Sequence, residues 1–169
     1  MPLVIIGVAL GSNLGNRRKH LDDAVDFLQT IAPLAALSSY YVSQPVDCPP
    51  GAGYFYNAVA QFRYEDDLPG LLERLQRYEI TRGRSLPSER GFNVPRPIDL
   101  DILYADGTLV AEPRLTLPHP RLTERLFVLE PLVEIAPDWI LPGSELTALE
   151  LLTRCRQKFG KQQVCLRIA

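Results

Sequence analysis

The stretch RPIDLDILYADGTLV, from Arg96 to Val110, predicts a β-strand that carries two acids on one face. Isoleucine and leucine alternate with Asp99 and Asp101, and successive side chains of a strand point to opposite faces of a sheet. Both carboxylates therefore share a face, roughly 6 to 7 Å apart along the strand. Repulsion at this separation raises the cost of ionising both, so the pattern predicts a cation opposite them.

Two kinds of cation fit this pair of carboxylates. In one interpretation Asp99 and Asp101 form salt bridges to Arg96 or to another arginine, or remain solvated on an exposed sheet face. In the other they bind Mg²⁺, which takes few protein ligands and completes its shell with water and substrate phosphates. The apolar face anchors the strand while the other face holds both acids in place, which favours the metal. The strand by itself leaves both interpretations open.

Basic residues flank the two acids along the chain. Guanidinium groups bind phosphate oxygens through paired hydrogen bonds, and Mg²⁺ neutralises the same oxygens, so acids and arginines together favour a bound triphosphate. Taken singly, such arginines are also typical of a charged protein surface. The basic residues are Arg82, Arg84, Arg90 and Arg96 before the acids, and Arg114, His119, Arg121 and Arg125 after them.

The hydrophobic periodicity predicts an α+β fold. The order strand-helix-strand-strand-helix-strand is that of a ferredoxin-like sandwich, an antiparallel sheet covered by helices, here with additional C-terminal helices. The turn Ala105-Asp106-Gly107 predicts a hairpin between the acidic strand and residues 108–117. The other expected strands span 3–10, 36–46 and 55–64, and the expected helices span 16–31, 66–84, 125–136 and 145–159.

Composition narrows the class of protein. The 169 residues fit a single domain, and the net charge of -2 argues against a nucleic-acid-binding protein, which normally carries a basic excess. Cys48, Cys155 and Cys165 are odd in number and share no metal-binding spacing, so we expect reduced thiols. The apolar N-terminal run is too short for a spanning helix and lacks a basic start. We expect a cytoplasmic monomer that does not associate with membranes.

Three further motifs give weaker signals. GSNLGNR, residues 11–17, lacks the Lys-Ser/Thr pair of a phosphate loop, so it predicts a turn with Asn16 as a helix cap rather than a nucleotide site. His119, between two prolines, is either a packed loop histidine or a ligand or acid-base group. Phe55 and Asn57 share a strand face and form either core packing or a recognition site for a flat heterocycle.

Several of these motifs together resemble a known family. GSNLGNR, YFYNAV, YEITRGR, RPIDLDILY and LPHPRLTERLFVLEPLVEIAPDW occur in the same order and spacing as in 6-hydroxymethyl-7,8-dihydropterin pyrophosphokinases, over nearly the whole chain. The most specific part is R-x-I-D-L-D-I followed by L-P-H-P-R-x-x-E-R-x-F. The resemblance implies one pyrophosphokinase domain over residues 1–169. It also implies transfer of pyrophosphate from ATP to a pterin alcohol, with release of AMP, in folate biosynthesis.

The same resemblance implies a role for individual residues. Asp99 and Asp101 would hold two Mg²⁺ ions that bridge the ATP phosphates. His119 would donate a hydrogen bond to a phosphate, because phosphoryl transfer needs cations and positioning more than a strong base. The ATP site would include Arg84, Arg90, Arg96, Arg114, Thr116, His119 and Arg125, with Glu79 toward the nucleoside; the pterin site would include Ser43, Gln44, Pro45, Val46, Phe55, Asn57 and Phe127.

The chain departs from the family pattern in two loops. Many members read Arg-Trp-Gly-Pro-Arg before the acidic strand, where this chain has RGFNVPR, with Phe92 in place of the tryptophan. We expect the loop 86–93 to close over the phosphates, with Arg90 meeting their charge and Phe92 covering a ligand. The loop VDCPPGAGYF, residues 46–55, also differs in length, so its contacts do not transfer from the family.

Two other functions compete with this one. Ferredoxin-like sandwiches also serve as non-catalytic modules that bind small molecules, although such a module needs neither both acids nor the surrounding arginines. A nucleotidyltransferase or nuclease also pairs carboxylates with Mg²⁺, but it must accommodate a polynucleotide, which the net charge of -2 does not favour. Formation of AMP from ATP only in the presence of the pterin alcohol would exclude both.

Overall fold

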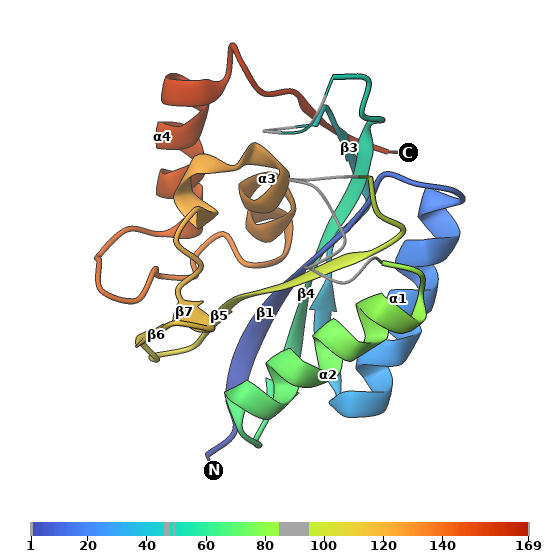
Figure 1. The fold of residues 1–169 in the computed structure, drawn as a ribbon. Coiled ribbons are helices and arrows are strands. Elements are labelled where there is room, and N and C mark those ends of the chain that lie inside the picture. Colours follow the sequence, from blue (N-terminus) through green and yellow to red (C-terminus); the bar gives the residue numbers. More distant parts are fainter. Residues whose placement is uncertain (1, 46–47, 49, 85–94, 169) are drawn as a thin grey trace.

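The computed structural model describes residues 2–45, 48, 50–84 and 95–168. Their order confirms the predicted succession of strands and helices, followed by two further helices (Figure 1). The elements are β1 Val4–Ser12, α1 Arg17–Ile31, β2 Leu34–Leu37, β3 Tyr41–Ser43, β4 Phe55–Tyr64, α2 Leu68–Thr81, β5 Asp99–Ala105, β6 Val110–Glu112, β7 Leu115–Leu117, the 3₁₀ helix η1 Leu122–Glu124, α3 Leu126–Ile135, α4 Ala148–Phe159 and β8 Cys165–Arg167.

The main sheet has the order β5-β1-β4-β3-β8, with β2 beside β4, and every pair in it is antiparallel. This is the ferredoxin-like arrangement, with the second strand of the motif divided into β2 and β3. The single strand predicted over 36–46 is therefore wrong in its extent. The division falls at Ser38, whose hydroxyl accepts a hydrogen bond from the main-chain nitrogen of Val59. The edge strand β8 has no counterpart in the prediction.

The predicted hairpin after β5 is also wrong. The turn at Gly107 forms, with Thr108 N donating to Ala105 O, but β6 then pairs with β7 instead of β5. The physical reason lies at the edge of β5, where Leu103 O accepts a hydrogen bond of 2.7 Å from His119 N. The segment that carries His119 thus occupies the edge that the hairpin would need.

Helices cover the two faces of the main sheet unequally. On one face lie α1 and α2 (Figure 1). Leu28 of α1 and Leu75 of α2 pack there in a core with Leu10 and Leu100. On the other face, α3 and α4 build a second core. A register shift between β1 and β5 adds one residue to β5, so it turns more apolar side chains toward the second core. The same face carries polar residues where β1 ends and where β4 and β5 begin, and this part forms the candidate site.

The second core depends on one glycine. A Cβ on Gly7 would lie 2.4 Å from Cε1 of Tyr104, whose ring stacks on Trp139 and whose hydroxyl accepts a hydrogen bond from Gln61. Since this ring is fixed on several sides, we expect Gly7→Ala to lower the free energy of unfolding by about 2 kcal/mol in a urea titration. Gly53→Ala, whose Cβ would meet only an oxygen at 3.5 Å, is the control. Equal stability of both variants would contradict the packing argument.

Among the described residues, no helix is long and apolar enough to cross a membrane.

Candidate functional site

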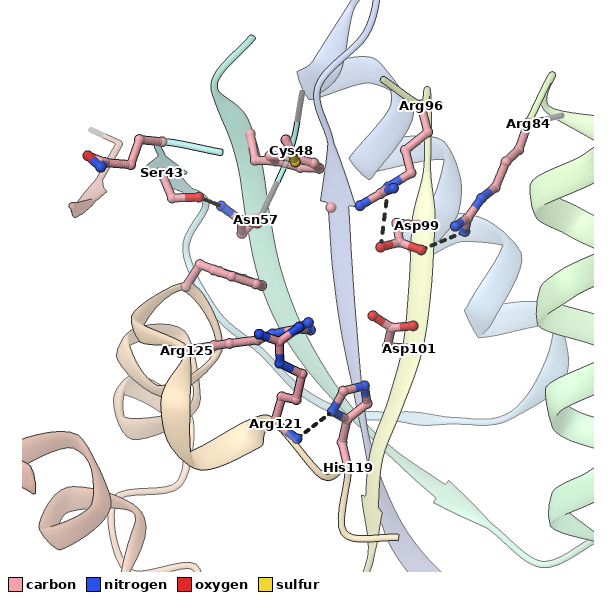
Figure 2. A pocket seen from close by; sticks show the side chains of 14 residues that line it. Ser43, Cys48, Asn57, Arg84, Arg96, Asp99, Asp101, His119, Arg121 and Arg125 are labelled. Atoms are coloured by element: carbon pink, nitrogen blue, oxygen red, sulfur yellow. Dashed lines mark hydrogen bonds and ion pairs between the residues drawn. The ribbon is translucent and has the colours of Figure 1, made fainter. Parts of the chain in front are cut away.

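A cavity of about 250 Å³ lies where β1 ends and β4 and β5 begin (Figure 2). Loops and α3 complete its walls. Most of the residues predicted for the site line this one cavity, although they come from segments far apart in the sequence. The lining residues are Gly11, Ser43, Gln44, Cys48, Phe55, Asn57, Arg84, Arg96, Asp99, Asp101, His119, Arg121, Arg125 and Phe127.

The floor of the cavity follows from strand register. Gly11 pairs with Asp99 on one side and with Asn57 on the other, so the three residues form a row across the sheet. Gly11 has no side chain, and a Cβ there would lie 3.5 Å from the Phe55 ring and 3.6 Å from Asn57 Oδ1. The row therefore has an acid at one end, an amide at the other and a gap between them.

Asp99 confirms the salt-bridge interpretation for one of the two acids. Its carboxylate lies 2.6 Å from Nη1 of Arg84 and 3.5 Å from Nε of Arg96 (Figure 2). Arg84 reaches it because α2 ends in a Schellman motif: Gly83, with φ of 100°, donates to Ile80 O, and Arg84 N donates back to Glu79 O. The C-terminal end of α2 thus places the Arg84 guanidinium against Asp99, one of the two candidate metal ligands.

Arg96 is held in place by the segment after β1. Asn13 N donates to Arg96 O at 3.2 Å, and Arg96 N donates to Asn13 Oδ1 at 2.8 Å. The neighbouring Asn16 accepts a hydrogen bond from Lys19 N, which confirms the predicted helix cap. The turn predicted in GSNLGNR thus forms at residues 13–16, between β1 and α1, and it also anchors a basic residue of the cavity.

Asp101 differs from Asp99. Its side chain points into the cavity, and Figure 2 shows no hydrogen bond or ion pair from it to the other residues drawn. Burial raises the pKa of Asp101, and the charges of Asp99 and Glu79 raise it further. A half-buried carboxylate without these contacts is available to a cation. Asp99 becomes available only after Arg84 and Arg96 move.

Glu79 lies beneath the site, not within the cavity lining. It is 6% exposed, pairs with Arg84 and accepts a hydrogen bond from Leu100 N at 3.0 Å. Burial raises the pKa of Glu79, as does the charge of Asp99, while Arg84 lowers it. The arginine in turn has a raised pKa, because the carboxylates of Asp99 and Glu79 outweigh the opposing effect of its burial. Glu79 and Asp99 therefore share one cation.

His119 is a neutral hydrogen-bond donor in this arrangement. Burial lowers its pKa to about 4, and the charge of Arg125 acts in the same direction. Its Nδ1 accepts a hydrogen bond of 3.2 Å from Arg121 N, so the proton of the neutral ring is on Nε2 (Figure 2). The ring thus presents an N–H rather than a lone pair, which suits the predicted contact with a phosphate oxygen better than a role as a base.

The opposite end of the cavity is aromatic and amide-bearing. Asn57 is 3% exposed, and its Nδ2 donates to Ser43 Oγ at 2.8 Å (Figure 2). This bond commits the amino group to the protein and leaves the carbonyl oxygen toward the cavity. Phe55 and Phe127 lie below guanidinium groups, with Arg96 Cζ and Arg125 Cζ each 5.4 Å from the ring centroid. Such a wall can hold a flat, polar ring system.

Some predicted site residues lie elsewhere. Arg114 and Thr116 line a second cavity of about 280 Å³, which shares Asp101 and His119 with the first. Pro45 lines a third, beside Arg121 and Arg125. The expected roles of Val46, Arg90 and Phe92, and the closure of the loop 86–93, lie outside the described residues.

The cavity also contains residues that the sequence did not assign to it. Arg121 belonged only to the predicted basic surroundings, and Gly11 and Cys48 carried no site prediction. Gly11 could have been inferred from its place on the strand next to the acids. Arg121 lies in a loop without periodicity, so no sequence pattern placed it.

The donor set of the site suits a hard divalent cation with few protein ligands. Two carboxylates project from one strand, and the described residues contain no group of three or more histidines, cysteines and acids that could hold a metal. This excludes an all-protein cage among the described residues and leaves room for water and phosphate ligands, as Mg²⁺ requires.

Comparison with known proteins identifies the family of the chain. A model of the 7,8-dihydro-6-hydroxymethylpterin-pyrophosphokinase (HPPK) family matches residues 7–137. The 2-amino-4-hydroxy-6-hydroxymethyldihydropteridine pyrophosphokinase of Pseudomonas aeruginosa is 39% identical over 151 residues, 88% of this chain and 90% of its own length. The protein of the same name from Porphyromonas gingivalis is 38% identical over 144 residues, 83% of this chain and 95% of its own.

Solved structures support the fold. The Plasmodium falciparum HPPK-DHPS wild type with pterin and p-hydroxybenzoate superposes with a TM-score of 0.71 at 15% identity, over 95% of this chain and 44% of its own. This chain thus spans less than half the length of that structure. The family match and the identities to the two bacterial proteins carry the assignment: the chain belongs to the 7,8-dihydro-6-hydroxymethylpterin-pyrophosphokinase family.

Proposed function

We propose that this protein transfers pyrophosphate from ATP to the hydroxymethyl group of 6-hydroxymethyl-7,8-dihydropterin, which gives AMP and the pterin diphosphate for folate biosynthesis. The observation that carries the proposal is that different parts of one cavity carry different kinds of side chain. Asp99, Asp101 and Arg84 lie at one end. Asn57 and the two phenylalanine rings line the rest of the cavity, with the guanidinium groups of Arg96 and Arg125 over the rings. A phosphate donor and a flat acceptor would then meet in the middle.

Two Mg²⁺ ions would be held by Asp99 and Asp101 together with ATP phosphates. When bound, the metal neutralises phosphate oxygens and orients the triphosphate of ATP for in-line transfer. In the structure Arg84 and Arg96 form ion pairs with Asp99. We infer that nucleotide binding moves these guanidinium groups from the carboxylate to the phosphates, because each would gain a more highly charged acceptor.

The protein groups that act on the phosphates are donors. Arg84, Arg96 and Arg125 would bind phosphate oxygens, and Nε2 of His119 would add a neutral hydrogen bond. Charge that accumulates on these oxygens during transfer strengthens each contact, which lowers the barrier without a strong base. Arg114 and Thr116, in the second cavity beyond Asp101, would bind the nucleotide from its other side. Glu79 would act from beneath by holding Arg84.

Nucleotide analysis tests the reaction. We expect AMP to form from ATP and Mg²⁺ only when 6-hydroxymethyl-7,8-dihydropterin is added, with one pterin diphosphate for each AMP. Binding of the pterin without turnover would instead indicate a non-catalytic module. Release of inorganic pyrophosphate with incorporation of AMP into a polynucleotide would indicate a nucleotidyltransferase.

The monomeric state and the cytoplasmic location stay predictions from the sequence. Light scattering on the purified protein tests the monomeric state.

Replacement of Asn57 should distinguish binding of the pterin from binding of ATP. Because its carbonyl oxygen would pair with a polar edge of the pterin, Asn57→Ala should weaken pterin binding by about 10- to 100-fold, which corresponds to about 1 to 3 kcal/mol for an unpaired polar group. Calorimetry should show nearly unchanged affinity for a non-hydrolysable ATP analogue. Ser43→Ala, which removes the acceptor of the Asn57 amide and one hydroxyl from the cavity lining, should have a smaller effect in the same direction. Equal loss for both ligands would remove Asn57 from the pterin site.

A further inference from the structure

One side chain holds the backbone on both sides of Arg125. Gln163 lies in the segment between α4 and β8, and its Oε1 accepts a hydrogen bond of 3.0 Å from Leu126 N. Its Nε2 donates a hydrogen bond of 2.7 Å to Glu124 O. The two contacts fix the orientation of the amide, since the reverse orientation would place donor against donor and acceptor against acceptor. A single residue thus links the carbonyl before Arg125 to the N–H after it.

This link replaces a missing helix cap. Helix α3 begins at Leu126, and Arg125 occupies the N-cap position without a side-chain hydrogen bond to the helix. Serine, threonine, aspartate or asparagine usually fills that position and satisfies an orphan N–H. Here an arginine fills it, and the acceptor for the first N–H of the helix comes from a residue 37 positions away. The N-cap position of α3 thus carries Arg125, which lines the cavity, and Gln163 of the C-terminal segment caps the helix in its place.

Gln163 acts on the cavity only through the backbone. Arg125 lines the main cavity together with Asp101 and His119, and its charge affects the pKa of both. Gln163 is not among the residues that line that cavity; it lines the neighbouring one, which it shares with Arg125. It therefore lies behind the chain from which Arg125 projects and does not reach the place where the reacting phosphates would lie.

We propose that Gln163 is a positioning residue for pyrophosphate transfer, because it fixes the backbone that aims Arg125 at the phosphates. This inference rests on the role proposed above for Arg125. Gln163 also lies beyond residues 7–137, the part of the chain that matches the family model. The segment after α4 crosses toward the sheet edge beside β3, where β8 pairs with β3 and so fixes its far end (Figure 1). The C-terminal segment thus braces one wall of the site.

Replacement by methionine tests the proposal. Gln163→Met keeps the length of the side chain and removes both hydrogen bonds, so Arg125 should sample more orientations. We expect kcat to fall about tenfold, with less than a twofold change in KM for the pterin, because the Asn57 end of the cavity is untouched. Amide hydrogen exchange at Leu126 should accelerate. Gln157→Met, the same change at an exposed residue of α4, is the control and should alter none of these quantities.

A double-mutant cycle separates positioning from general stability. In an Arg125→Ala background, Gln163→Met should change kcat by less than about twofold, because the residue it positions is gone. A full tenfold loss in that background would overturn the proposal, as would normal kcat in Gln163→Met beside an impaired Arg125→Ala. Normal kcat in Arg125→Ala alone would overturn the role of Arg125 and this inference with it, while pterin-dependent AMP formation in the wild type would still support the reaction.

A second variant tests the proposal if Gln163→Met does not fold. If Gln163→Met unfolds, Gln163→Glu retains the acceptor for Leu126 N but replaces the donor to Glu124 O by a second carboxylate oxygen, which cannot form that hydrogen bond. It should show a loss of kcat smaller than tenfold, and the loss should again disappear in the Arg125→Ala background. A Gln163→Glu protein with wild-type kcat and wild-type exchange at Leu126 would contradict the proposal.

Discussion

Asp101→Asn is expected to give a folded protein whose turnover with ATP and pterin is at least about a thousandfold lower than that of the wild type. This corresponds to about 4 kcal/mol of transition-state stabilisation, which is the scale expected for loss of a metal ligand at a phosphoryl-transfer site. Asparagine keeps the size of the side chain and removes the charge. Steady-state assays at saturating Mg²⁺ measure the effect, and Asp99→Asn should give a loss of similar size.

The same change should stabilise the protein without ligands at alkaline pH. Burial and the charge of Asp99 raise the pKa of Asp101 from its ordinary value of 3.8 to about 7, so the folded state prefers the protonated carboxyl. Ionisation of Asp101 therefore destabilises the wild type above pH 7, and this penalty disappears as the pH falls from about 7 toward 4. Thermal midpoints without Mg²⁺ should show Asp101→Asn more stable than the wild type at pH 8 and equal to it near pH 4.

A matched control uses another acid near β5. Asp106 accepts a hydrogen bond from Trp139 Nε1 and lies outside the cavity lining. Asp106→Asn retains an acceptor at this place and should leave turnover unchanged. Normal turnover in Asp101→Asn, or a loss of stability in proportion to the loss of turnover, would mean that Asp101 is a structural residue and not a metal ligand.

Arg84→Ala is expected to lower the free energy of unfolding by about 3 kcal/mol. Glu79 and Asp99 share this guanidinium, and their side chains are 8% and 21% exposed. Removal of one partner from a buried ion pair leaves an uncompensated charge, which costs more than the pair itself contributes. The loss should be greatest at alkaline pH, because burial raises the pKa of Glu79 to about 7 and its carboxyl is ionised only above that pH. Urea titration at pH 8 measures it.

Two further variants test the cause of that loss. Glu79→Gln in the Arg84→Ala background should recover most of the stability, because it removes one of the two facing charges and keeps the acceptor for Leu100 N. Arg82→Ala, which removes a more exposed ion pair to Asp23, should cost less than about 1 kcal/mol. An Arg84→Ala loss no larger than that of Arg82→Ala, or no recovery with Glu79→Gln, would contradict the shared-cation arrangement.

The parts of the fold that the sequence predicted are those determined by local patterns. β4 was predicted with its observed bounds, and α1 begins after the cap at Asn16 that the sequence indicates. β8 could not be predicted, because three residues at a sheet edge carry no periodicity and pair with β3 only through long-range contacts. The hairpin after β5 failed for a similar reason, since the sequence does not show that His119 N binds to Leu103 O.

The candidate site divides in the same way. The shared face of Asp99 and Asp101 follows from strand alternation alone, and the structure confirms it. The difference between the two acids does not, because it depends on where the end of α2 places Arg84. Gly83 indicates that the helix ends there, but not which acid the next residue meets. Gln163 likewise shows no sequence signal, since it caps a helix that begins 37 residues earlier.

We propose that one cavity holds the pterin and the ATP phosphates within reach of each other. A crystal structure with 6-hydroxymethyl-7,8-dihydropterin, α,β-methylene ATP and Mg²⁺ tests it most directly. We expect Asp99 and Asp101 to bind Mg²⁺ that also contacts the phosphates, Arg84 to have left Asp99 for a phosphate oxygen, and Asn57 to bind the pterin. The hydroxymethyl oxygen should lie about 3 to 3.5 Å from the β-phosphorus, in line with the bond to the leaving group. A metal bound away from both aspartates, or a pterin bound away from Asn57, would contradict the account.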